Sequence, residues 1–141
     1  MKRLLLALSA AALSAAVLVP VALGYRGHRV YTPQGGVATR AYRPSVVAIS
    51  GDASYYVSHV RWSSYNGAQA LGRGTSNVDN CDPDCARGHV YHESVVVRLT
   101  RPHRTCGVWY YGTIHLFWPG RKPPGKGRHD TVAIGPFTCG G

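Results

Sequence analysis

Residues 68–76 read Ala-Gln-Ala-Leu-Gly-Arg-Gly-Thr-Ser. Small residues stand at every second position from Ala68 to Gly74, and larger residues stand between them. A period of two predicts a β-strand, because successive side chains of a strand point to opposite faces. The small face is expected to lie close to other backbone or to aromatic rings. A helix would need apolar residues three and four positions apart, and this stretch has none of that spacing.

Five other stretches have strand character, because β-branched and aromatic residues alternate or run together in them. They cover residues 46–49, 55–63, 93–100, 108–118 and 131–137. Turn-forming pairs such as Asn-Gly and Pro-Gly stand between them. The pattern predicts an all-β fold, a small antiparallel β-sandwich or barrel of about six strands, and leaves the choice between the two open.

The stretch 108–118 carries aromatic residues on both faces of its strand. One face is expected to belong to the core and holds Val108, Tyr110, Ile114, Leu116 and Trp118. The other face is a candidate binding surface for sugars or a protein and holds Trp109, Tyr111, His115 and Phe117. Alternatively, both faces are buried, as in a central strand between two layers.

The N-terminus has the order of a secretory signal peptide. A basic start at Lys2 and Arg3 precedes an apolar run that closes with small residues at Ala22 and Gly24. Cleavage after Gly24 is expected; an uncleaved anchor is the alternative, because about 20 apolar residues can span a bilayer. Residues 25–44 are expected to form an extended basic arm, and residues 45–141 a single β domain.

Charge and composition limit the classes of function that are compatible with the chain. The 141 residues include 16 Lys and Arg against 6 Asp and Glu, a formal charge of +10, which becomes +8 without residues 1–24. Four of the basic residues fall in one loop before the last strand: Arg121, Lys122, Lys126 and Arg128. A multidomain protein, a polytopic membrane protein and a helical bundle are excluded. For an exported basic protein we expect an anionic polymer of the cell envelope, or another extracellular protein, as partner rather than nucleic acid or a membrane.

Four cysteines in an exported chain are expected to form disulfides. Three pairings are possible. Cys81 and Cys85 are the easiest pair to close, which leaves Cys106 to pair with Cys139. In the loop-entropy description the two bonds would contribute about 2 and about 3.7 kcal/mol.

The loop around the first cysteine pair is also acidic. Asp79, Asp82 and Asp84 could offer oxygen ligands to calcium, and Cys81 and Cys85 with His89 and His92 could bind zinc. The spacing does not match an EF-hand, and a disulfide removes two of the zinc ligands. A disulfide-closed turn is therefore the favoured interpretation, with no metal and no cofactor.

The chain carries no recognised catalytic frame. There is no Gly-x-Ser-x-Gly element, and Glu93 is the only glutamate. We expect a secreted, non-catalytic binding or interaction module at the cell envelope. One alternative is an extracellular protease inhibitor that presents the Cys81–Cys85 loop, because a preorganised loop loses little entropy on binding. The other is an unrecognised hydrolase, because a catalytic triad is a spatial arrangement that sequence does not exclude.

Several of these motifs occur in a characteristic order. Trp62 and Tyr65 form a Trp-x-x-aromatic element, residues 70–74 read Ala-x-Gly-x-Gly, residues 81–88 read Cys-x-Pro-x-Cys-Ala-x-Gly, and a Val-rich strand follows. This order resembles a group of small secreted proteins of actinobacteria, over about residues 49–101. Tyr65 stands where tryptophan is commoner in the group. The resemblance implies export, a β-rich fold and a bacterial host, and it carries over no catalytic residue.

Overall fold

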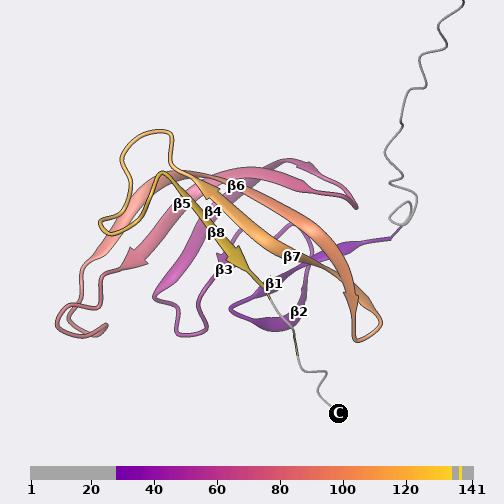
Figure 1. The fold of residues 1–141 in the computed structure, drawn as a ribbon, viewed down its shortest axis with the longest axis horizontal. Coiled ribbons are helices and arrows are strands. Elements are labelled where there is room, and N and C mark those ends of the chain that lie inside the picture. Colours follow the sequence, from indigo (N-terminus) through magenta and orange to yellow (C-terminus); the bar gives the residue numbers. More distant parts are fainter. Residues whose placement is uncertain (1–27, 135–136, 138–141) are drawn as a thin grey trace, which may run out of the picture.

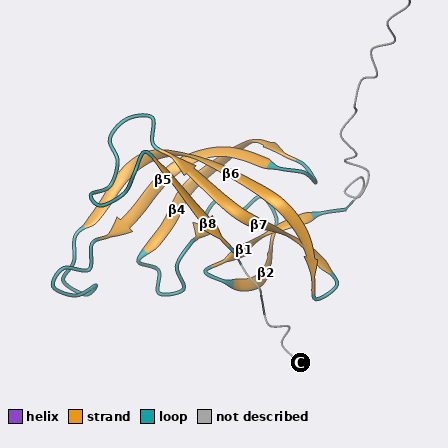
Figure 2. Cartoon of the chain, viewed as in Figure 1, coloured by secondary structure: helices purple, strands orange, loops and turns teal. Residues whose placement is uncertain are grey.

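The computed structural model describes residues 28–134 and residue 137, which form eight strands and no helix (Figure 2). The strands are β1 (Val30–Gln34), β2 (Val37–Ala41), β3 (Val47–Ala48), β4 (Tyr55–Tyr65), β5 (Ala70–Asp79), β6 (Val90–Thr105), β7 (Val108–Phe117) and β8 (His129–Ala133). The predicted all-β class is confirmed. The described residues contain no helix able to cross a membrane. The expected signal peptide, residues 1–24, lies outside the described residues.

All eight strands belong to a single sheet that curls into a half-barrel (Figure 1). The strand order is β2-β1-β7-β6-β5-β4-β3, and β8 pairs with β7 outside this path. β1 pairs with the beginning of β7 in parallel, and β8 pairs with its end in antiparallel orientation. The prediction of about six strands in a wholly antiparallel sandwich or barrel therefore needs correction in strand number and in the parallel β1–β7 pair.

The two additional strands come from the segment that was expected to be an arm. β1 and β2 form an antiparallel hairpin inside the sheet, joined by Gly35 and Gly36 at φ +56° and +79°. Two successive residues with positive φ are the geometry of the tightest hairpin turn, and glycine adopts it without strain. Pro33 lies where the β1–β2 register shifts, so its missing N–H does not interrupt a regular ladder.

β4 contains two irregularities that bend the strand. The β4–β5 register shifts between Ser58 and Arg61 and again between Trp62 and Ser64, and His59 has φ +53°. A bulge adds one residue to its strand, bends it and increases its twist. Because of the first shift, Val57 and Val60 are both buried although they are three residues apart.

The core lies on the concave face of the sheet. β5 contributes the small face that the sequence predicted: a Cβ on Gly72 would lie 2.9 Å from a ring carbon of Trp62. The small face therefore lies against an aromatic ring, as expected. The bulkier core side chains come from the strands on both sides and include Val57, Val95, Val97, Leu99, Ile114, Leu116 and Trp118.

The Cys81–Cys85 disulfide is present, with an S–S distance of 2.00 Å. It closes the loop between β5 and β6, and this pairing is confirmed. Cys139 lies outside the described residues, so its predicted pairing with Cys106 stays a prediction.

Two buried phenols predict instability at high pH. Burial, and then the nearby Asp130 carboxylate, raise the pKa of Tyr55 above its usual range; burial and the neighbouring tyrosines do the same for the pKa of Tyr111. Both side chains are at most 9% exposed. Unfolding frees them to ionise near pH 10, so the free energy of unfolding falls above that pH by about 1.4 kcal/mol per tyrosine and pH unit. By pH 11 the loss is about 3 kcal/mol.

Urea unfolding followed by circular dichroism between pH 8 and pH 11.5 measures this loss. Absorbance near 295 nm reports tyrosinate, which should appear together with unfolding. In Tyr55→Phe the loss above pH 10 should be smaller by about 1.4 kcal/mol per pH unit. A free energy of unfolding that stays constant from pH 10 to pH 11 would contradict the prediction.

Candidate functional site

The candidate surface residues of β7 do not share one exposed face. Tyr111 is fully buried in the core, so it is withdrawn from the binding surface. Its hydroxyl donates a hydrogen bond to the carbonyl oxygen of Asn66. Tyr111 and Ile114 both lie in the core although they are three residues apart, so the alternation of β7 breaks between them. In the opposite strand, Arg101 faces this break with φ +53°.

The expected core residue Tyr110 is also buried, but away from this core cluster. Its ring contacts Phe137, with centroids 5.5 Å apart, and its hydroxyl donates to the carbonyl oxygen of Ala38 at 3.1 Å. The β1–β2 hairpin therefore covers the face of β7 opposite Tyr111. At this point of β7 both faces are buried, the alternative that the sequence left open.

His115 and Phe117 lie together on the convex face of the sheet. The ring of Phe117 stacks on His129 with centroids 4.7 Å apart, and 36% of Phe117 is exposed. His115 is half-buried between Thr100 and Thr131, at 2.9 Å and 3.3 Å from their hydroxyl oxygens. Burial, and then the charges of Arg98 and Arg101, lower the pKa of His115, so it is neutral at pH 7.

Trp109 lies elsewhere, beside a basic hollow of about 220 Å³. We call it the basic hollow; its lining residues are His28, Arg29, Tyr31, Arg40, Gly107, Val108 and Trp109. The parallel pairing of Val30 with Trp109 brings the start of β1 to the start of β7, and the hairpin turn returns β2 to the same place. Three segments far apart in the sequence therefore build it.

Aromatic contacts position His28 and Arg29 at the basic hollow. The rings of His28 and Trp109 stack with centroids 6.3 Å apart, and the Arg29 guanidinium carbon lies 5.2 Å from the centroid of Tyr42. Tyr31 contacts Tyr42, with centroids 6.2 Å apart. A guanidinium over an aromatic face is favourably placed and keeps its donors available to an anion. The site therefore combines a stacking surface with two arginines.

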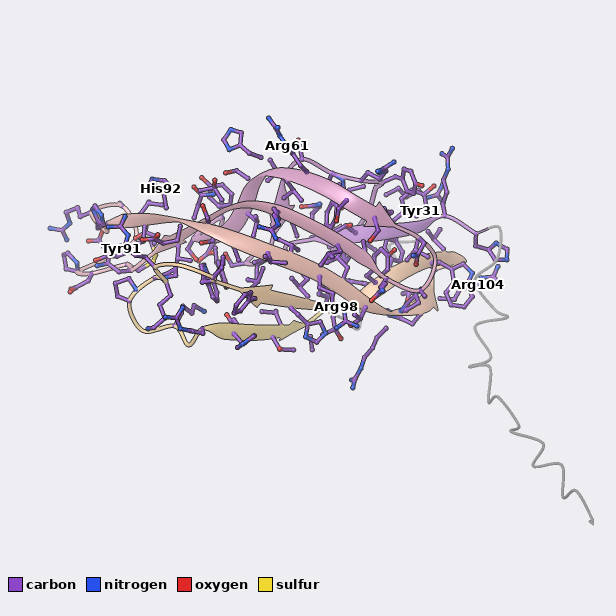
Figure 3. All side chains as sticks on the ribbon, turned by 90° about the horizontal axis from the view of Figure 1, so that it is seen from above. Tyr31, Arg61, Tyr91, His92, Arg98 and Arg104 are labelled. Carbon is purple, nitrogen blue, oxygen red and sulfur yellow. A yellow bond between two sulfur atoms is a disulfide. The ribbon has the colours of Figure 1, made fainter. Side chains whose placement is uncertain are left out.

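The charges of the protein are unevenly distributed over the sheet. All six carboxylates lie in the β3–β4 and β5–β6 connections, at the end of β5 or near the starts of β6 and β8. Within the described residues, the three ion pairs engage Arg87, Arg121 and Lys126. The described arginines without a carboxylate partner are Arg29, Arg40, Arg43, Arg61, Arg73, Arg98, Arg101, Arg104 and Arg128. Figure 3 shows Tyr31 and Arg104 near one end of the sheet and Tyr91 and His92 near the other.

The basic loop before β8 is largely engaged in structure. Arg128 donates to the carbonyl oxygens of Trp118, Pro119 and Gly120 at 3.2–3.5 Å. Lys126 pairs with Asp130 at 3.1 Å and lies 4.4 Å from the centroid of Tyr55. These two residues hold the loop closed.

Arg121 and Lys122 lie at the other side of that loop, far along the sheet from Trp109. Both line a second hollow, beside the start of β6, where Arg121 approaches the Glu93 carboxylate at 3.4 Å. The structure therefore distributes the candidate binding residues over several places instead of joining them in one surface.

The carboxylates of the acidic loop accept hydrogen bonds from the loop's own backbone N–H groups. Asp79 accepts a hydrogen bond from the N–H of Cys81 at 2.8 Å, and Asp84 accepts from the N–H groups of Ala86 and Arg87. The Arg87 guanidinium lowers the pKa of Asp84. Within the described part of the chain, no three His, Cys, Asp or Glu side chains are grouped as metal ligands would be. The arrangement is that of a hydrogen-bonded turn.

The sequence did not single out the basic hollow. Arg29, Arg40 and Tyr31 were visible as a basic, aromatic segment, but the parallel β1–β7 pairing that joins them to Trp109 has no local pattern. A comparison of the chain with protein-family models, with curated proteins and with solved structures finds no match.

Proposed function

We propose that the protein is a secreted, non-catalytic binding module that holds an anionic polymer of the cell envelope in its basic hollow. The observation that supports this most strongly is the lining itself: two arginines, a histidine and two aromatic rings, with no carboxylate. Aromatic faces stack on sugar rings, and guanidinium groups bind carboxylate or phosphate through paired hydrogen bonds. The disulfide and the apolar N-terminus agree with export.

The surrounding surface supports the same partner. Arg104 lies near the hollow at the end of β6, and Arg43 follows β2. On the convex face, Arg61 stands opposite Arg73 in the β4–β5 register, and both are exposed. A polymer bound at the hollow would meet further cations along the sheet. Unpaired surface cations attract an extended polyanion over distances of about a Debye length, so affinity should fall as salt rises.

Binding to purified anionic cell-wall polymer at rising sodium chloride tests the proposal. The double variant Arg29→Ser/Arg40→Ser should lose about tenfold in affinity at low salt, since two charge-assisted contacts disappear. The matched control Arg121→Ser/Lys122→Ser removes the same charge from the opposite side and should change the affinity less than about twofold. An equal loss in both variants, or no binding by the unaltered protein at low salt, would overturn the proposal.

A further inference from the structure

The first part of β6 has an unpaired edge. β5 pairs with β6 from Val90 onward, whereas β7 pairs with it only from Val96 onward. Residues 90–95 therefore lack a strand neighbour on the β7 side within the described part of the chain. Their outward N–H and C=O groups are a template on which another extended segment can form a ladder.

The sequence explains why β7 does not continue along this edge. In the register of the pair, Pro119 would stand opposite Ser94. Proline has no N–H to donate to the ladder and is not found in central strands. Instead, the N–H of Trp118 donates to the carbonyl oxygen of Arg128 at 3.0 Å, and the chain leaves the sheet in a loop. The edge of β6 is therefore open because Pro119 prevents β7 from continuing along it.

A hollow of about 810 Å³ lies at this edge. We call it the edge groove; it is lined by residues 89–93 of the chain, Arg121, Lys122 and Pro124. Successive side chains of a strand point to opposite faces, so a hollow that is lined by the four consecutive β6 residues 90–93 lies along the edge of the strand. Figure 3 shows Tyr91 and His92 at this end of the sheet. An added strand of about five residues would span about 17 Å and lie about 4.8 Å from β6.

The charges at the edge groove select the kind of segment. Arg121 and Lys122 are exposed on its loop side, and His89 and His92 are exposed on its strand side. Its single carboxylate, Glu93, is only 16% exposed and faces Arg121 at 3.4 Å. Arg121 and Lys122 against Glu93 leave the lining a net charge of +1 with its histidines neutral. The Lys122 ammonium donates to the carbonyl oxygen of Lys126 at 2.6 Å and has no carboxylate partner among the described residues. This excess of positive charge favours carboxylates on the incoming segment.

We propose that the edge groove binds an extended, acidic peptide segment of another protein, which adds a strand to β6 in the place that β7 leaves empty. The peptide backbone forms the ladder with residues 90–94, and its acidic side chains meet Arg121 and Lys122. Strand addition of this kind takes its affinity from main-chain hydrogen bonds and its specificity from side chains at alternate positions. The proposal is independent of the basic hollow, which lies at the other end of the sheet.

The test uses the full mature chain and fluorescent peptides of about seven residues in which valine alternates with glutamate. A second peptide has lysine in place of glutamate, and a third has proline at its centre. The glutamate peptide should bind about tenfold more tightly than either. Its binding should also slow amide hydrogen exchange within residues 90–94, which contact through side chains alone would not do.

A pair of variants assigns the contact. Arg121→Ser/Lys122→Ser should weaken binding of the glutamate peptide about tenfold, and Arg61→Ser/Arg73→Ser, with the same loss of charge on the convex face, should not. The proposal is overturned by no binding at about 1 mM peptide, by binding that leaves exchange in residues 90–94 unchanged, or by equal binding of the proline peptide. Concentration-dependent dimerisation that protects these amides without peptide would also overturn it and identify a second copy as the occupant.

Discussion

Replacement of Gly74 by alanine is expected to destabilise the protein by about 3 kcal/mol. A Cβ at this position would lie 2.6 Å from the carbonyl oxygen of Ser58 and 2.9 Å from a methyl group of Val57. The first of these atoms is backbone, and it belongs to the register shift that bends β4 over β5. The strands can relieve the clash only by opening that bend, which also separates the core side chains around it. Valine at position 74 should lower the free energy of unfolding more than alanine does.

Urea denaturation of Gly74→Ala and of the matched variant Gly120→Ala measures the effect. Gly120 has no atom within 4 Å of the position of a Cβ, so its replacement should change the free energy of unfolding by less than about 0.5 kcal/mol. Equal stability of the two variants would show that β4 and β5 do not approach as closely as the structure has them.

The close approach at Gly74 belongs to the part of the fold that was predictable. Alternation of small and large residues in 68–76 identified both the strand and its small face, because the pattern is local and has a direct steric cause. The other five predicted stretches each overlap a strand of the sheet, although β4, β6 and β8 extend beyond the predicted bounds. The Cys81–Cys85 pair was predictable for the same reason, since only three residues separate the two cysteines.

The β1–β2 hairpin was not predicted, although the sequence contains a recognisable turn for it. Gly35 and Gly36 stand between two short β-branched stretches, which is a recognised hairpin pattern. The proline at position 33 and the many arginines favoured an arm instead. Proline is compatible with β1 because it falls at an irregular position of the pairing. A sequence pattern counts any proline as evidence against a strand, because it does not show which N–H groups donate hydrogen bonds in the sheet.

The face of Tyr111 and the basic hollow were beyond local patterns. A strict period of two assigns Tyr110 and Ile114 to one face, whereas the alternation breaks near Gly112, opposite Arg101 in the neighbouring strand. The hollow depends on a parallel pairing of segments about 80 residues apart, which is a tertiary contact. Sequence therefore predicted the charged and aromatic residues available for binding, but not which of them meet.

Replacement of Trp118 by alanine is expected to destabilise the protein by about 4 kcal/mol, more than Gly74→Ala. Trp118 is fully buried at the end of β7, and its Nε1–H donates to the hydroxyl of Ser76 at 2.9 Å. That hydroxyl in turn donates to the carbonyl oxygen of Glu93 at 3.1 Å. The side chain therefore fills the core and joins the end of β7 to β5, beside residues 90–95 of β6, which have no strand neighbour on the β7 side within the described residues.

Two further variants separate the packing of Trp118 from its hydrogen bond. Trp118→Phe keeps most of the apolar contact and loses the donor, so it should cost about 1–2 kcal/mol, and it stays measurable if the alanine variant does not fold. Phe117→Ala, the neighbour on the convex face, should cost less than about 1 kcal/mol because Phe117 is partly exposed. Urea denaturation of the three variants measures the free energy of unfolding that each one loses. If Phe117→Ala were as costly as Trp118→Ala, the convex face near the end of β7 would be buried against something, and the description of Phe117 as partly exposed would be wrong.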